Sequence, residues 1–91
     1  MKMFVFDEIS AEVILKAQKE TERIGYKFCD IVRYSNHPDD NYLYYVIGRG
    51  GYMDGYNIWL YNESQNSLCS GTYDLTFKEM LGVLAEKVNE I

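Results

Sequence analysis

The residues best suited to chemistry stand together in one short segment, His37-Pro38-Asp39-Asp40-Asn41. An imidazole beside carboxylates is a pairing used for general acid–base catalysis, and clustered carboxylate and amide oxygens suit calcium. Asp, Asn and Pro are also ordinary turn residues, and His37 is the only histidine of the chain. The sequence contains no His-Glu-x-x-His, nucleophile-elbow or EF-hand pattern. We therefore interpret the segment as a turn and expect a protein that is not an enzyme.

A run of glycines with one guanidinium, Gly48-Arg49-Gly50-Gly51, has the composition of a phosphate-binding loop. Such loops open a helix and contain a Gly-Lys-Ser/Thr pattern. This run instead lies between two strand candidates, and no such pattern follows it. We interpret it as a hairpin turn, in which Arg49 remains able to form a salt bridge to a partner.

Two cysteines, Cys29 and Cys69, stand forty positions apart, without a Cys-x-x-Cys pair. Free cysteine is among the most buried residue types, so we expect two half-buried thiols that a cytoplasmic setting keeps reduced. The sequence leaves open whether they lie close together. A structural zinc site needs four ligands, whereas the chain has two cysteines and one histidine. We therefore expect neither a metal nor a cofactor.

Length and composition indicate one domain over residues 1–91, with 47% hydrophobic and 25% charged residues, as in ordinary globular proteins. Nine Lys and Arg against fourteen Asp and Glu give a net charge of −5. This balance disfavours direct binding to nucleic acid, because that affinity comes largely from cations that displace counterions. The apolar run at Met1–Phe6 is too short for a signal peptide, and no run approaches a membrane span. We expect a cytoplasmic protein that binds no membrane.

Two helices are predicted from their caps and from apolar residues that recur every three or four positions. Thr76-Phe77-Lys78-Glu79 matches the capping box Thr-x-x-Glu and predicts a helix over residues 77–90. A second helix begins after a cap at Ser10 (or Asp7) and ends at Gly25, where a left-handed residue would close it.

Between the helices the period changes to two, and aromatic and β-branched residues dominate. Turn residues separate the runs, and the short connections suit antiparallel pairing. The predicted strands are Tyr26–Tyr34, Tyr42–Ile47 and Tyr56–Tyr61, with a weaker one at Leu68–Tyr73 and an edge strand at Met1–Phe6.

Together these segments predict an α+β fold of order α-β-β-β(-β)-α. Each predicted helix has one apolar face, so we expect both helices packed on one face of a three- or four-stranded antiparallel sheet. The order helix–strands–helix resembles that of the double-stranded-RNA-binding domain, whose second helix begins with a basic cluster that grips phosphates. Here that position reads Thr76-Phe77-Lys78-Glu79, with one Lys beside one Glu, so the resemblance in topology implies no RNA binding.

The negative charge and the tyrosines gather in the same part of the sequence. Residues 36–76 contain five carboxylates, Arg49 as their one Lys or Arg, and seven of the nine tyrosines. In Tyr42-Leu43-Tyr44-Tyr45-Val46-Ile47 both alternating sets contain tyrosine, so helices on one face would leave at least one tyrosine off that face. Tyrosine is enriched at protein interfaces, and carboxylates steer a basic partner. The competing interpretation is that these are ordinary strand and turn residues.

From this coincidence we expect a small acidic protein-binding module. It would act as an inhibitor on the basic, nucleic-acid-binding surface of an enzyme or toxin, its carboxylates mimicking phosphates, as in anti-CRISPR, anti-restriction or immunity proteins. The predicted contact residues are Asp39, Asp40, Tyr42, Tyr44, Asp54, Tyr56, Glu63 and Asp74. The alternative is a structural or assembly protein that forms a homodimer or larger assembly through an open Tyr-rich sheet face.

Overall fold

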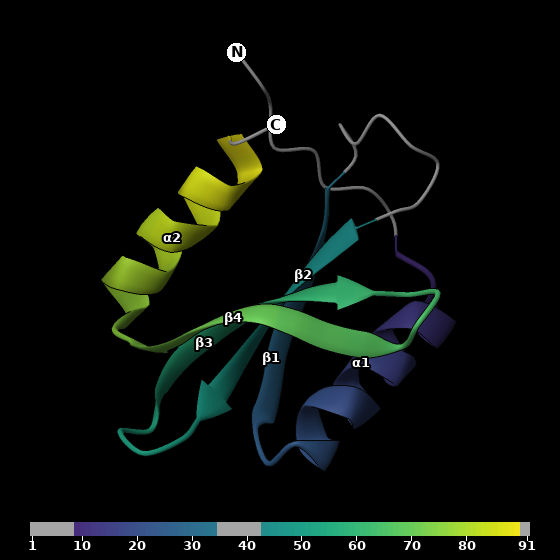
Figure 1. The fold of residues 1–91 in the computed structure, drawn as a ribbon, viewed down its shortest axis with the longest axis horizontal. Coiled ribbons are helices and arrows are strands. Elements are labelled where there is room, and N and C mark those ends of the chain that lie inside the picture. Colours follow the sequence, from purple (N-terminus) through teal and green to yellow (C-terminus); the bar gives the residue numbers. More distant parts are fainter. Residues whose placement is uncertain (1–8, 35–42, 90–91) are drawn as a thin grey trace.

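The computed structural model describes residues 9–34 and 43–89. Its elements, in chain order, are α1 (Ala11–Arg23), β1 (Lys27–Tyr34), β2 (Leu43–Gly50), β3 (Gly55–Asn62), β4 (Ser67–Leu75) and α2 (Phe77–Asn89). The strands form one antiparallel sheet in the order β1-β2-β3-β4 (Figure 1). The predicted α+β class, the antiparallel sheet and the order α-β-β-β-β-α are confirmed. The edge strand predicted at Met1–Phe6 lies outside the described residues.

Both predicted caps form. The Thr76 backbone N–H donates to the Glu79 carboxylate at 3.0 Å, and the Glu79 N–H donates to the Thr76 hydroxyl at 3.1 Å, which is the reciprocal capping box. At the start of α1 the Ser10 hydroxyl accepts from the Val13 N–H at 3.3 Å, while the alternative cap, Asp7, is outside the described part. Gly25 follows α1 with φ +94°, as its predicted role requires. Within residues 9–34 and 43–89, neither helix is long and apolar enough to cross a membrane.

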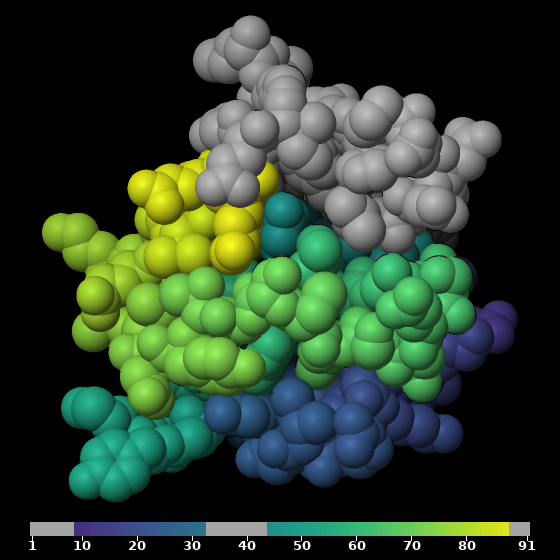
Figure 2. All heavy atoms as spheres, in the orientation of Figure 1, coloured from purple at the N-terminus to yellow at the C-terminus, as the bar shows by residue number. Residues whose placement is uncertain are grey.

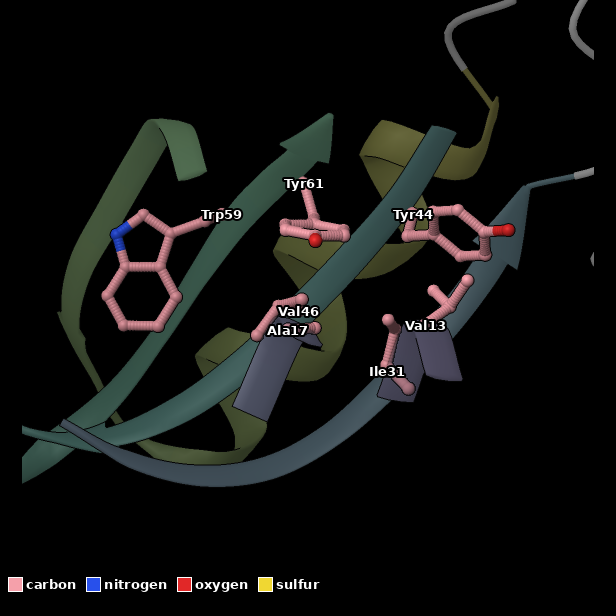
Figure 3. Close-up of a cluster of buried hydrophobic side chains, with 7 residues drawn as sticks. All are labelled: Val13, Ala17, Ile31, Tyr44, Val46, Trp59 and Tyr61. Atoms are coloured by element: carbon pink, nitrogen blue, oxygen red, sulfur yellow. The ribbon is translucent and has the colours of Figure 1, made fainter. Parts of the chain in front are cut away.

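One face of the sheet packs against α1. The buried side chains Val13 and Ala17 of the helix meet aromatic and aliphatic side chains of β1, β2 and β3 (Figure 3). The strand members of this cluster are Ile31, Tyr44, Val46, Trp59 and Tyr61. The largest of these, Trp59, is 1% exposed.

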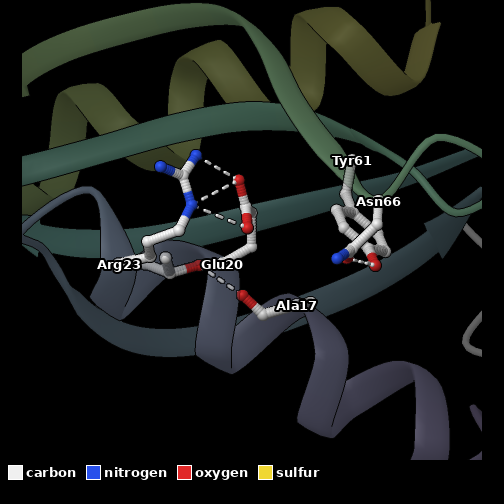
Figure 4. Close-up of polar contacts among 6 residues, drawn as sticks. Ala17, Glu20, Arg23, Tyr61 and Asn66 are labelled. Atoms are coloured by element: carbon white, nitrogen blue, oxygen red, sulfur yellow. Dashed lines mark hydrogen bonds and ion pairs between the residues drawn. The ribbon is translucent and has the colours of Figure 1, made fainter.

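The opposite face packs against α2, whose buried Met80 lies in a cluster with Tyr45, Ile47 and Ile58. Neighbouring residues of a strand point to opposite faces, so Ile47 and its neighbour Val46 face different helices. Figure 4 shows the same arrangement, with α1 and its Glu20–Arg23 ion pair on one side of the strands and α2 on the other.

The prediction that both helices lie on one face is therefore wrong. The physical reason was visible in the β2 sequence, since a strand with apolar residues at nearly every position is typical of a sheet covered on both sides. In β2, Tyr44 and Tyr45 are 4% and 8% exposed, although they point in opposite directions. The adjacent tyrosines are therefore both buried, Tyr44 on the face covered by α1 and Tyr45 on the face covered by α2.

Strand β4 is longer and less regular than predicted. Its pairing with β3 shifts register twice, and Ser70 and Asp74 have φ values of +53° and +58°. Each shift sets an extra residue of β4 against β3, as in a β-bulge. The second bulge fixes the position of Asp74, one of the predicted contact residues.

Candidate functional site

The structure divides the predicted contact residues into separate groups. Three lie outside the described part of the chain: Asp39, Asp40 and Tyr42. The other five fall near opposite ends of the paired strands β2 and β3, each of which has eight residues. Eight residues of strand span about 25 Å, so the two ends carry two separate groups of residues and not one cluster. Of the five predicted residues that the structure describes, Tyr44 and Glu63 therefore lie apart from Asp54, Tyr56 and Asp74.

Tyr44 and Glu63 are at one end. The Tyr44 ring is 4% exposed and belongs to the core cluster under α1. Its hydroxyl donates to the Glu63 carboxylate at 3.4 Å. Tyr44 is therefore a core residue, which removes its ring from the predicted surface, and Glu63 serves as a partner of that ring.

Asp54, Tyr56 and Asp74 meet at the other end, although twenty positions separate the two aspartates. They line a hollow of about 270 Å³ between the β2–β3 turn and the start of α2. We call the surface around this hollow the turn surface and define it by Arg49, Met53, Asp54, Tyr56, Asp74 and Phe77. In the space-filling view the turn projects from the body of the molecule at lower left (Figure 2).

Large apolar side chains are exposed at and beside this surface. Met53 is 71% exposed and Phe77 56% exposed, and the neighbouring Tyr52 at the tip of the turn is 98% exposed. Sequence reasoning did not select these three residues. A signal was present in Gly51-Tyr52-Met53-Asp54, because the tip of a turn has no packing need for a tyrosine and a methionine.

Four side chains contact one another in series across the turn surface: Asp54, Arg49, Tyr56 and Phe77. The Arg49 guanidinium lies 3.8 Å from the Asp54 carboxylate and 5.4 Å from the centre of the Tyr56 ring. The Tyr56 ring in turn meets the Phe77 ring edge-on, with 5.5 Å between centroids. Because Arg49 and Asp54 are both largely exposed, their ion pair adds at most about 1 kcal/mol. Both remain accessible to a partner.

The side chain of Asn57 links the backbone segments that carry the turn surface. It is fully buried, and its side-chain amide donates to the carbonyls of Gly48, Gly50 and Gly55 at 3.3, 3.3 and 3.1 Å. Its side-chain oxygen accepts from the backbone N–H of Asp74 at 3.0 Å. These hydrogen bonds connect the ends of the β2–β3 turn to the bulge of β4, so the backbone at both ends of the exposed turn is restrained.

The described residues offer little for metal chemistry. No group of three or more His, Cys, Asp and Glu in residues 9–34 and 43–89 is arranged to hold a metal ion. Cys29 and Cys69 are free, and both are exposed rather than half-buried as expected. Cys29 is the extra residue at the irregularity in β1, which places its thiol beside the face that carries α2.

Comparison with protein-family models, curated proteins and solved structures finds no match to this chain.

Proposed function

We propose that this protein is a protein-binding module that docks through the turn surface. The observation that carries the proposal is the pair Tyr52 and Met53, 98% and 71% exposed at the tip of a turn whose ends are held by the buried Asn57. Exposed side chains of this size contribute little to folding, whereas aromatic residues and methionine are enriched in interface cores. A fixed backbone lowers the entropy lost when these side chains bind.

Charge supports a basic partner. Asp54 and Asp74 line the turn surface against the single cation Arg49, and the whole chain carries a net charge of −5. Such a field speeds encounter with a positively charged surface and disfavours acidic ones. The target in this proposal is a basic protein, such as a nucleic-acid-binding enzyme or a toxin, which the module inhibits in the manner of an anti-CRISPR, anti-restriction or immunity protein.

In this proposal apolar side chains contribute more to the interface, and carboxylates less, than we expected from the sequence. Two carboxylates of the described chain lie on the turn surface, which is too few to reproduce a row of phosphates. The apolar side chains Met53 and Phe77 therefore supply most of the buried area in this proposal, and the carboxylates supply orientation.

The alternative is self-assembly through an open Tyr-rich sheet face, for which the described part of the chain offers Tyr73 of β4, 50% exposed, while the tyrosines of β2 and Tyr61 of β3 are buried. Tyr44 and Tyr61 are buried under α1, and Tyr45 is buried on the side of α2. Assembly through these rings would require a helix to leave the sheet.

The test compares the full chain with a double variant, Tyr52→Ser with Met53→Ser, as immobilised bait in cell extracts. Leu15→Ser is the matched control, because Leu15 is 54% exposed on α1. We expect a basic protein whose recovery falls about tenfold with the double variant, stays unchanged with the control and decreases as salt rises. Recovery of the same proteins by all three baits, or of none by the wild-type chain, contradicts the proposal.

A further inference from the structure

A second, more apolar hollow of about 450 Å³ lies between α2 and the β1–β2 side of the sheet. Its floor is formed by Val32 and Ile47, which are 5% and 6% exposed. Its rim is formed by Phe77 and Leu81, which are 56% and 49% exposed. Helix α2 packs on β3 and β4, so this rim is turned toward the other half of the sheet. We call this hollow the α2 groove.

The α2 groove continues into the turn surface, since Tyr56 and Phe77 line both hollows. Three carboxylates line the joined hollows, Asp30 in the groove and Asp54 and Asp74 at the turn surface, against the single guanidinium of Arg49. An occupant that fits both the apolar floor and this charge has apolar side chains with a Lys or Arg beside them.

The edge of β1 is poorly suited to pairing with an added strand. Its ladder with β2 is irregular at Cys29, and the Ile31 backbone N–H donates to the Asp30 carboxylate at 2.8 Å. Bulges and charged groups of this kind are the usual means by which edge strands avoid further pairing. An extended segment would therefore find a poor partner in this edge.

The length of the groove suits a helix. Phe77, Leu81 and Leu84 line it along α2, and seven residues of helix rise about 10 Å. That length accepts two side chains one helical turn apart, about 5–6 Å. We infer that the α2 groove binds an amphipathic helix of the same basic partner, with two apolar anchors three or four positions apart and a Lys or Arg facing Asp30. This inference rests on the proposed function and names the segment that the partner presents.

The test uses a displayed library of random twelve-residue peptides, selected against the immobilised full chain. Enriched peptides are then measured by fluorescence anisotropy with wild-type protein, Leu81→Lys and the matched control Leu15→Lys. We expect the enriched peptides to carry the two spaced apolar residues and a basic residue. Their affinity should fall about tenfold or more with Leu81→Lys, because a charge enters the apolar contact, and stay unchanged with Leu15→Lys. Circular dichroism checks folding, and Leu81→Ser replaces the lysine variant if that variant unfolds.

The inference is overturned if no peptide is enriched, if the enriched peptides are acidic, or if they bind Leu81→Lys as tightly as the wild type. The double variant at Tyr52 and Met53 separates this failure from failure of the proposed function. If the double variant no longer recovers the basic protein from extracts, while the peptides bind Leu81→Lys as tightly as the wild type, the turn surface is the interface and the α2 groove is not. If the peptides bind Leu81→Lys more weakly, while the double variant recovers the basic protein as the wild type does, the α2 groove is the interface and the turn surface is not.

Discussion

The buried side chain of Asn57 joins β3 to the bulge at Asp74. Its Oδ1 accepts a hydrogen bond from the Asp74 backbone N–H at 3.0 Å. Asp74 has a φ of +58°, a conformation that costs a non-glycine residue free energy. The hydrogen bond holds that conformation in place. It also places the Asp74 carboxylate of β4 on the same surface as Asp54, which lies in the β2–β3 turn.

Replacing Asn57 by leucine should destabilise the protein by about 3 kcal/mol, since the change leaves three carbonyls and the Asp74 N–H without this partner. Urea unfolding followed by circular dichroism measures the loss. Gln65→Leu is the matched control, an amide replaced by leucine at an exposed turn position, and should change stability by less than about 0.5 kcal/mol. Equal stability of the two variants would mean that Asn57 does not brace the turn.

Gly48→Ala should also destabilise the protein, by about 1–3 kcal/mol. A Cβ at this position would lie 2.7 Å from the Trp59 ring, which is 1% exposed and cannot move without disturbing the core. Fluorescence of Trp59, the only tryptophan, reports the unfolding transition. Gly82→Ala in α2 is the control: a Cβ there meets nothing within 4 Å, so alanine should stabilise by about 1 kcal/mol. A neutral Gly48→Ala would contradict the close packing under Trp59.

The parts of the fold that could be predicted depend on contacts close in sequence. The capping box of Thr76 and Glu79 and the cap at Ser10 each involve residues three positions apart, and both are present. Residue types alone indicate such contacts, because the backbone between the partners has one helical geometry. The four strands of the described sheet were likewise predicted within a few residues of their observed bounds.

The face of each helix and the turn surface depend on contacts between distant residues. Tyr44 and Tyr45 carry the same side chain, and only the position of two helices more than twenty residues away decides that both are buried. Asp54 and Asp74 meet because β4 is bulged, and nothing near Asp74 in sequence predicts that shift of register. The charge of the candidate site was therefore predictable in part. Of its apolar members, Met53 had a signal in its place at the tip of a turn, whereas Phe77 had none.

The capping box makes stability depend on pH. Hydrogen bonds from the Thr76 backbone N–H and hydroxyl lower the pKa of Glu79 in the folded chain. Because the folded pKa is the lower one, the contribution is complete above the unfolded value of about 4.3 and is lost as the pH falls through the folded value. Urea unfolding at pH 7 and pH 3 should show that the wild type loses stability relative to Glu79→Gln. A difference between the two proteins that is independent of pH would contradict this role.

The Cys29 thiol reports on the α2 groove that it lines. Although Cys29 is exposed as a residue, partial desolvation of its sulfur raises the pKa of the thiol, and the nearby Lys27 and Arg49 offset only part of this effect. In the Cys69→Ser variant, where Cys29 is the only thiol, alkylation by iodoacetamide should therefore be slower at neutral pH than in the same chain unfolded in urea, because less thiolate is present. The midpoint of the pH–rate curve should move downward on unfolding. A groove-binding peptide should slow the reaction further. A folded Cys29 that reacts as fast as the unfolded one, with or without the peptide, would show that this thiol is not shielded by the groove.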